Sequence, residues 1–165
     1  PGKIESSDRP MLYEIAKTVH VIGVILLVGN VSATAIWKLF ADRTGDPKIM
    51  AFAQKLVTYT DFSLTLWGII LIVGGGYAAA LIGELDLVGQ GWLLYGQLLF
   101  VVSGALWLGI LLPLQIRQAR AAKRFGESSE VHEQYWRDCR SWIIWGLVAT
   151  VPLVAGIWVM IAKPD

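Results

Sequence analysis

Four long apolar segments limit what this chain can fold into. Arg, Lys, Asp and Glu are absent from all of them, and they run over Thr18–Trp37, Phe62–Gly83, Leu87–Ile116 and Ser141–Ala162. Crossing about 30 Å of hydrocarbon takes roughly 20 apolar residues, and every segment reaches that length. None shows the alternation of polar and apolar residues that marks a membrane-spanning strand. We therefore predict an integral membrane protein with four transmembrane helices, over about 18–38, 60–83, 90–116 and 141–162.

The composition leaves little polar sequence to coat a soluble core. Hydrophobic residues make up 55% of the 165 residues and charged residues 16%, against roughly 25% charged in a soluble domain. No repeat or second domain is visible in the sequence. We predict one all-α domain, a four-helix transmembrane bundle over residues 12–165. Residues 1–11 form a polar tail, which is either native or left over from an expression vector.

The basic residues predict how the helices are oriented. Ten of them lie in the 38–61 and 117–140 loops, whereas the two ends of the chain and the 84–91 loop together hold four. Because Lys and Arg accumulate on the cytoplasmic side, we expect both long loops in the cytoplasm and both termini on the outer side of the membrane. Basic groups at membrane edges give no indication of nucleic-acid binding. The expected partners are the lipid bilayer, other membrane subunits or further copies of the chain.

Local signals predict where helices begin and break. Asp46-Pro47 is typical of a helix start, with Asp as the cap and Pro in the first turn, so the second helix is expected to begin there. Pro113 predicts a kink in the third helix. Ser129 is the candidate cap of a short helical segment, 130–140, that leads into the fourth span. Cys139, the one cysteine, is expected in a loop near the membrane edge.

Polar side chains in the first span gather on one helical face. Successive residues of an α-helix are turned by about 100°, which places these side chains and one glycine in a stripe about 80° wide. The stripe consists of His20, Gly23, Asn30, Thr34 and Lys38. Polar groups in a membrane are costly, so this stripe is expected to face protein. Asn30 lies near the midplane, where its commonest role is to bridge two helices. Asp61, at the inner start of the second apolar segment, is expected to pair with Lys38.

His20 lies about one turn inside the outer surface of the membrane. A neutral imidazole there can ligate a metal or haem iron, relay a proton, or simply hydrogen-bond a neighbouring helix. The third helix also enters from outside, so its side chains near position 95 share the depth of His20. A pocket in the outer leaflet is expected between His20 and three residues of that helix, Trp92, Tyr95 and Gln97.

Other metal arrangements find less support in the sequence. Met11 and Met160 both fall near the outer face, but two weak ligands make a thin case for copper. His132 lies in the polar 117–140 loop and cannot share a site with His20. A transmembrane bis-histidine haem within one chain is therefore excluded.

Several short motifs recur in one known group of proteins. They are Lys17-Thr18-Val19-His20-Val21-Ile22-Gly23, Gly29-Asn30, Thr34-Ala35-x-Trp37-Lys38, Gly91-Trp92-Leu93, Arg140-x-Trp142 and Lys163-Pro164. With these motifs the chain resembles, over nearly its whole length, an uncharacterised family of predicted bacterial integral membrane proteins. That family falls in the CopD-like superfamily, which includes the HemJ-type protoporphyrinogen oxidase.

The resemblance implies a haem-linked role for His20, because the first-helix histidine of the HemJ-type enzyme is associated with haem binding. A helix-three lysine supports activity there. Gln97 stands at that position and carries no charge, which argues against porphyrinogen oxidation. The sequence thus favours a protein that binds haem b, with His20 as metal ligand and Asn30, Trp92, Tyr95 and Gln97 around the cofactor. A non-catalytic accessory subunit and a copper-handling protein are the alternatives, and enzymatic activity is left open.

Overall fold

The computed structural model describes residues 7–125 and 131–164, and nearly all of them are helical. The elements in chain order are α1 (Arg9–Thr44), α2 (Pro47–Thr60), the π-helical turn η1 (Asp61–Thr65), α3 (Leu66–Ile82), α4 (Gly91–Leu106), the π-helical turn η2 (Trp107–Leu111), α5 (Leu112–Ala122) and α6 (Glu133–Ala162). Within the described ranges there is no β-strand. The all-α prediction is confirmed.

Four continuous helices in this part of the chain are long and apolar enough to cross a membrane. They are α1, α2–η1–α3, α4–η2–α5 and α6, with 36, 36, 32 and 30 residues. A 36-residue helix is about 54 Å long, whereas the hydrocarbon layer measures about 30 Å. The helices therefore continue beyond the membrane, and much of the 38–61 and 117–140 segments is helix extension instead of loop.

Capping side chains and a left-handed glycine define the helix ends. The Asp46 carboxylate accepts the Lys48 N–H at 2.8 Å, so the predicted cap of the second helix is confirmed. Gly45 precedes it with φ +65, a left-handed conformation that favours glycine. The helical segment predicted to lead into the fourth span is present, but it begins at Glu133, where His132, in extended conformation, caps α6 by accepting the Gln134 N–H. Ser129, the expected cap, lies outside the described residues.

Two π turns interrupt otherwise α-helical segments. In η1 the Leu66 N–H reaches the Asp61 carbonyl oxygen, five residues back. In η2 the Leu112 N–H does the same with Trp107. The second turn ends two residues before Pro113, whose ring lacks the N–H that an α-helical ladder would need. The sequence predicted a kink at Pro113, and the structure has a π-helical turn just before it.

The chain forms two compact units. Unit one comprises residues 1–36 and 59–87, and unit two comprises residues 37–58 and 88–165. α1 and the α2–η1–α3 helix each contribute to both units. The prediction of a single four-helix bundle stays a prediction.

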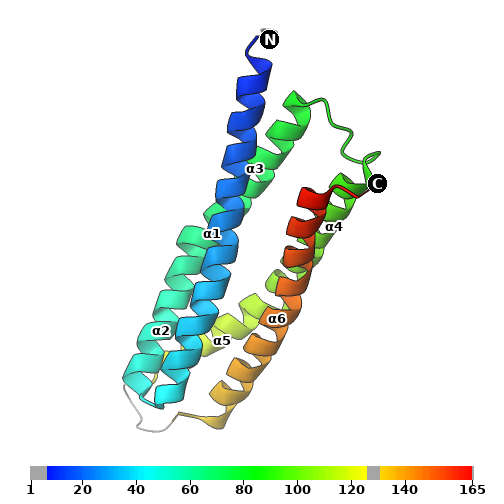
Figure 1. The fold of residues 1–165 in the computed structure, drawn as a ribbon. Helices are drawn as coiled ribbons and strands as arrows, with labels where there is room; N and C mark the ends of the chain where they lie inside the picture. The colour runs from blue at the N-terminus through cyan, green and yellow to red at the C-terminus, as the bar shows by residue number, and fades with distance from the viewer. Residues whose placement is uncertain (1–6, 126–130, 165) are drawn as a thin grey trace. The chain divides into compact units, whose positions relative to one another are not determined.

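Unit one is an antiparallel helix pair, in which α1 runs beside η1 and α3 (Figure 1). The α1 residues at the contact are spaced by four and three residues, and they are Ala16, His20, Gly23, Leu27 and Asn30. The partner helix repeats this spacing with Asp61, Thr65, Gly68, Ile72 and Gly75. Such spacing is typical of helices that pack as in a left-handed coiled coil.

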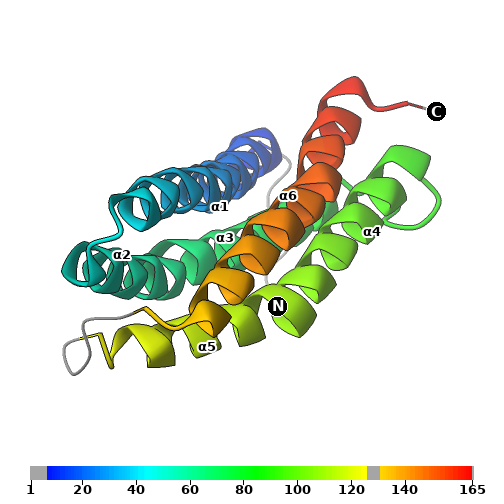
Figure 2. The ribbon, with the colours of Figure 1, turned by 90° about the horizontal axis from the view of Figure 1, so that it is seen from below.

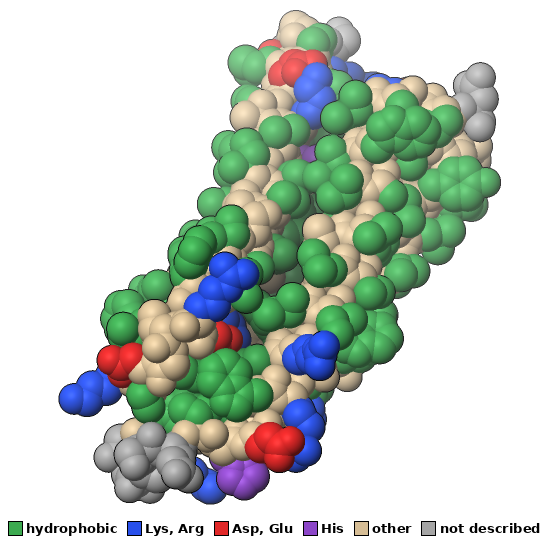
Figure 3. All heavy atoms as spheres, turned by 60° about the horizontal axis from the view of Figure 1, so that its bottom comes forward, with side chains coloured by type: hydrophobic (Ala, Val, Ile, Leu, Met, Phe, Trp, Pro, Cys, Tyr) green, Lys and Arg blue, Asp and Glu red, His purple; other side chains and the backbone are tan. Residues whose placement is uncertain are grey.

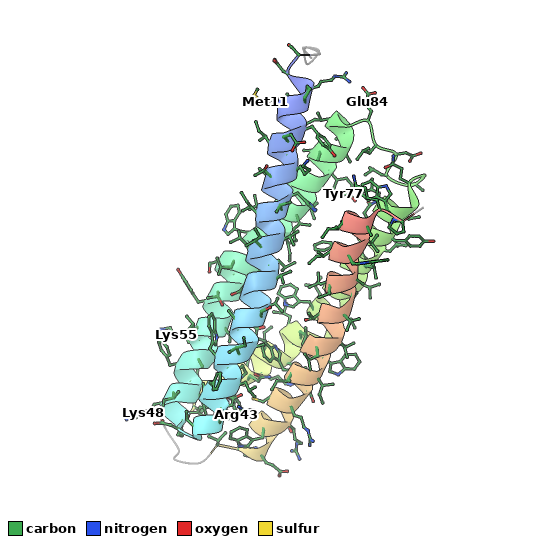
Figure 4. All side chains as sticks on the ribbon, in the orientation of Figure 1. Met11, Arg43, Lys48, Lys55, Tyr77 and Glu84 are labelled. Carbon is green, nitrogen blue, oxygen red and sulfur yellow. The ribbon has the colours of Figure 1, made fainter. Side chains whose placement is uncertain are left out.

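Glycines permit the close approach of the two backbones. A Cβ added to Gly23 would lie 2.7 Å from the Ile72 nitrogen, and one added to Gly68 would lie 3.0 Å from the Leu27 nitrogen. Small residues commonly play this part between membrane helices. At one end of the pair Arg9 and Glu84 form an ion pair, and Figure 4 shows Met11 and Glu84 at that same end.

Unit two packs α6 antiparallel to α4 and α5, as Figure 2 shows. Near one end the Met160 side chain fills the space over Gly96. In the middle the Ser103 hydroxyl donates to the Ala149 carbonyl oxygen at 2.8 Å. Towards the other end Met50, Ala122, Phe125, Tyr135 and Cys139 form a buried cluster. Figure 3 shows hydrophobic side chains along the helices of the face in view, with charged side chains towards the helix ends.

Candidate functional site

His20 is held against α3 by a hydrogen bond to the backbone. Its Nδ1 lies 2.7 Å from the Ile72 carbonyl oxygen. Because a carbonyl oxygen only accepts, Nδ1 must carry the proton, and in the neutral ring Nε2 then keeps its lone pair. The ring lies beside Gly76, where an added Cβ would come within 2.8 Å of Nδ1. The glycine and the carbonyl together orient the imidazole.

Asn30 connects α1 to η1, as predicted for a polar residue near the midplane. Its Nδ2 donates to the Asp61 carboxylate and to the Thr65 hydroxyl, both at 2.9 Å. The Thr65 hydroxyl lies 3.2 Å from the same Asp61 oxygen. Asn30 and Thr65 are buried, with 3% and 2% of their surface exposed. The prediction that the polar stripe of α1 faces protein is confirmed by Gly23, Asn30 and Thr34, which are all buried.

The predicted pairing of Asp61 with Lys38 was wrong. Lys38 instead donates to Asp42, one turn further along α1, at 3.2 Å, and to the Tyr135 hydroxyl at 3.0 Å. The Tyr135 hydroxyl also donates to Asp42 at 3.1 Å. Side chains four residues apart lie next to each other on one face of a helix, so Asp42 is a near neighbour of Lys38. Asp61 is already occupied by the neutral donors Asn30 and Thr65.

The Lys38–Asp42–Tyr135 cluster of unit two is nearly sealed from its surroundings. Lys38, Tyr135 and Asp42 are 1%, 2% and 8% exposed. The Lys38 ammonium group also lies 5.1 Å from the centre of the Tyr135 ring, within the range of a cation–π interaction. A buried charge is stable only when it is paired and hydrogen-bonded, and each member of this cluster supplies a partner to the others.

A second polar network joins α5 to α6. Arg117 donates two hydrogen bonds to the two Asp138 carboxylate oxygens, both at 3.1 Å. Gln134 donates to one of the same oxygens, and Gln118 donates to the Asp138 backbone carbonyl. The two-pronged guanidinium contact fixes the geometry of the carboxylate as well as its charge. Asp138 is buried, whereas the Arg117 side chain is 54% exposed.

Cys139 lies next to these networks, and its predicted loop position was wrong. It is an α6 residue, buried in the cluster around Tyr135. A pocket of about 310 Å³ adjoins it, lined by Leu39, Asp42, Arg43, Trp136, Cys139, Arg140 and Ile143. The continuous helix from Glu133 onward explains the difference, because it carries the cysteine into the packed interface.

The remaining predicted cofactor residues belong to unit two. Gln97 donates to the Leu93 carbonyl oxygen of its own helix at 3.1 Å. Tyr95 is exposed, and the Lys163 ammonium group lies 5.0 Å from the centre of the Trp92 ring. His20 and Asn30 belong to unit one. The pocket expected between His20 and the three helix-three residues stays a prediction.

The other histidine and the two methionines considered as metal ligands lie apart from one another in the sequence. His132 caps α6 through its Nδ1. Met160 packs over Gly96, and Met11 is 60% exposed. Among the residues that the structure describes, no three His, Cys, Asp or Glu side chains form a metal-binding group. Copper handling stays a prediction.

Sequence reasoning missed the roles of Asp42, Tyr135 and Asp138. Lys38 and Asp42 are spaced four apart, which is a usable signal for a helical ion pair. Nothing local in the sequence indicates that Tyr135 completes the pair, because that contact spans 97 residues.

Comparison with known proteins gives one match. A family model described as "Predicted integral membrane protein (DUF2269)" matches residues 14–164. No curated protein matches the chain, and no solved structure does.

Proposed function

Because the chain belongs to this family of predicted integral membrane proteins, we propose a function suited to a site within the bilayer. The protein binds a b-type haem through His20 and takes part in redox chemistry at the membrane. The 38–61 and 117–140 segments face the cytoplasm of a bacterial inner membrane, a proposal supported by their ten basic residues.

The hydrogen bond from His20 Nδ1 to the Ile72 carbonyl oxygen carries this proposal. Histidines that ligate metals almost always donate their other ring N–H to a carbonyl, a carboxylate or water. This bond fixes the tautomer and the orientation of the ring. Nε2 of His20 therefore has the electronic state that an axial ligand needs.

This chain offers one histidine nitrogen, Nε2 of His20, to a haem iron. The other histidine, His132, uses its Nδ1 to cap α6. Any further ligand to the iron would come from water or from another subunit. Bound haem would supply one-electron transfer, while His20 holds the iron and Ile72 orients His20.

Paired absorption spectra test the proposal. The wild type, His20→Ala and the matched control His132→Ala are expressed with haem supplied and purified in detergent. A Soret band is expected in the wild type and in His132→Ala but not in His20→Ala. Added imidazole should restore the band in His20→Ala, which separates a lost ligand from a lost fold. A folded wild type without haem would sink the proposal and favour the accessory-subunit alternative.

A further inference from the structure

We infer that Asp61 is a reversible proton-binding site within the membrane, with the Asn30 side-chain amide as its partner in both protonation states. The inference concerns the η1 end of the α1–α3 contact and does not depend on haem. It rests on the hydrogen bonds and burial of Asn30, Asp61 and Thr65.

The depth of Asp61 follows from its contact with Asn30. Asn30 lies inside Thr18–Trp37, a segment without charged residues. Its Nδ2 lies 2.9 Å from the Asp61 carboxylate, so the carboxylate lies at the same level as Asn30. Ionisable groups at such a depth are rare and mark ion or proton sites by default. Asp61 is partly buried by its helix partner.

The amide of Asn30 can satisfy either form of the carboxyl group. In the structure its NH₂ group faces Asp61 Oδ1, as an ionised carboxylate requires, while its own Oδ1 is buried without a hydrogen-bond partner. Turning the amide by 180° exchanges the two ends, and Oδ1 would then accept the O–H of a protonated Asp61. After the turn the NH₂ group would lose its bond to the Thr65 hydroxyl and take the place of Oδ1, where the structure shows no hydrogen-bond partner, so the turned orientation carries the cost of an unsatisfied donor.

The chemistry of the site favours a proton over a metal cation. The Asn30 NH₂ group lies on the Asp61 oxygen where a cation would bind, and it cannot itself ligate a cation. The charged neighbours are also remote along the chain. On α1 the next one is Lys38, which is paired with Asp42; on α2 it is Lys55; and beyond α3 it is Glu84. His20, the other titratable group of the α1 contact face, is bonded to Ile72.

The π turn η1 also supports a functional site at Asp61. Asp61 opens η1, and Thr65 closes it. Such turns are rare in helices and occur frequently at functional sites. Here the turn lies at the level of the carboxylate, and both Asp61 and Thr65 direct their side-chain oxygens to Asn30.

Infrared difference spectroscopy tests the inference on the protein in lipid vesicles. Spectra at low and high pH are subtracted for the wild type, Asp61→Asn, and the control Asp8→Asn, which removes an exposed carboxylate. Exposed carboxyl groups contribute C=O bands in every variant, but a separate high-frequency C=O band from a carboxyl group shielded from water is expected in the wild type and in Asp8→Asn and is lost in Asp61→Asn. Identical difference spectra for the wild type and Asp61→Asn would overturn the inference.

Two further measurements test the role of Asn30 and the choice between a proton and a metal cation. Asn30→Leu removes both the donor and the acceptor, so the C=O band of Asp61 should shift in frequency. An unchanged band would contradict the role of Asn30. Adding Na⁺ at constant pH should leave the spectrum unchanged, and a response like that to pH would assign a cation site instead. His20→Ala should keep the Asp61 band, which separates this test from that for haem.

Discussion

The buried ammonium group of Lys38 donates to the hydroxyl of Tyr135 across 3.0 Å, although 97 positions separate the two residues in the chain. The same hydroxyl donates to Asp42, so one tyrosine oxygen serves both members of an ion pair. This relationship ties the end of α1 to the start of α6 within unit two. Figure 4 shows Arg43 and Lys48 on either side of the turn that follows this end of α1.

Removing that hydroxyl should destabilise the protein. Tyr135→Phe keeps the ring but leaves the buried Lys38 and Asp42 each short of one partner, at a cost of about 1–3 kcal/mol. Denaturant unfolding in micelles, followed by tryptophan fluorescence, measures the change. Tyr59→Phe is the control, because Tyr59 is 70% exposed. Equal stability of the two variants would show that the cluster is not a stabilising unit.

Two adjacent glycines should respond differently to the same substitution. A Cβ on Gly75 would lie 2.6 Å from the His20 backbone nitrogen and 2.9 Å from the Ala16 carbonyl oxygen, whereas a Cβ on Gly74 meets nothing within 4 Å. Backbone atoms cannot turn aside, so Gly75→Ala should cost about 1–3 kcal/mol. Gly74→Ala should be neutral or stabilise the helix by up to about 1 kcal/mol. Thermal unfolding of both variants checks the order, and a reversed order would contradict the packing of unit one.

The Arg117–Asp138 pair should be asymmetric. Arg117→Met leaves a buried carboxylate without its bidentate donor, which should cost about 1–3 kcal/mol or more. Asp138→Asn leaves a half-exposed guanidinium group that water can solvate, and its amide oxygen still accepts from Gln134, so the cost should stay near 1 kcal/mol or less. Unfolding free energies of the two variants decide the matter. A larger loss for Asp138→Asn would refute the argument from burial.

Membrane orientation can be measured with single cysteines. Cys139 is 4% exposed, so the native thiol is a poor reporter and is first replaced by alanine. A membrane-impermeant maleimide should then label Val88→Cys on intact cells, and it should label Lys48→Cys only after permeabilisation. Both positions are exposed. Labelling of Lys48→Cys on intact cells would reverse the orientation inferred from the basic residues.

The sequence was sufficient for the spans and for the face of α1 that meets protein. Long uncharged segments and a stripe of polar residues are local features, and a membrane makes both energetically decisive. The Asp46 cap was predictable for the same reason, since it involves residues two positions apart.

The partner of Lys38 was not predictable. Asp61 and Asp42 were both available to it, and the choice depends on Tyr135 at the other end of the chain. The η1 turn was also missed, because no proline or glycine lies within Asp61–Thr65. Its position is fixed by tertiary contacts with Asn30.

The separation of Lys38 from Tyr135 has a consequence for biosynthesis. All residues of unit one precede Val88 in the chain. Both helices of this pair are therefore synthesised before α4, α5 and α6. At about 5–20 residues per second, Tyr135 is synthesised roughly 5–20 s after Lys38. During that interval Asp42, already made and one helical turn away, is the partner that keeps the lysine charge neutralised at the edge of the bilayer.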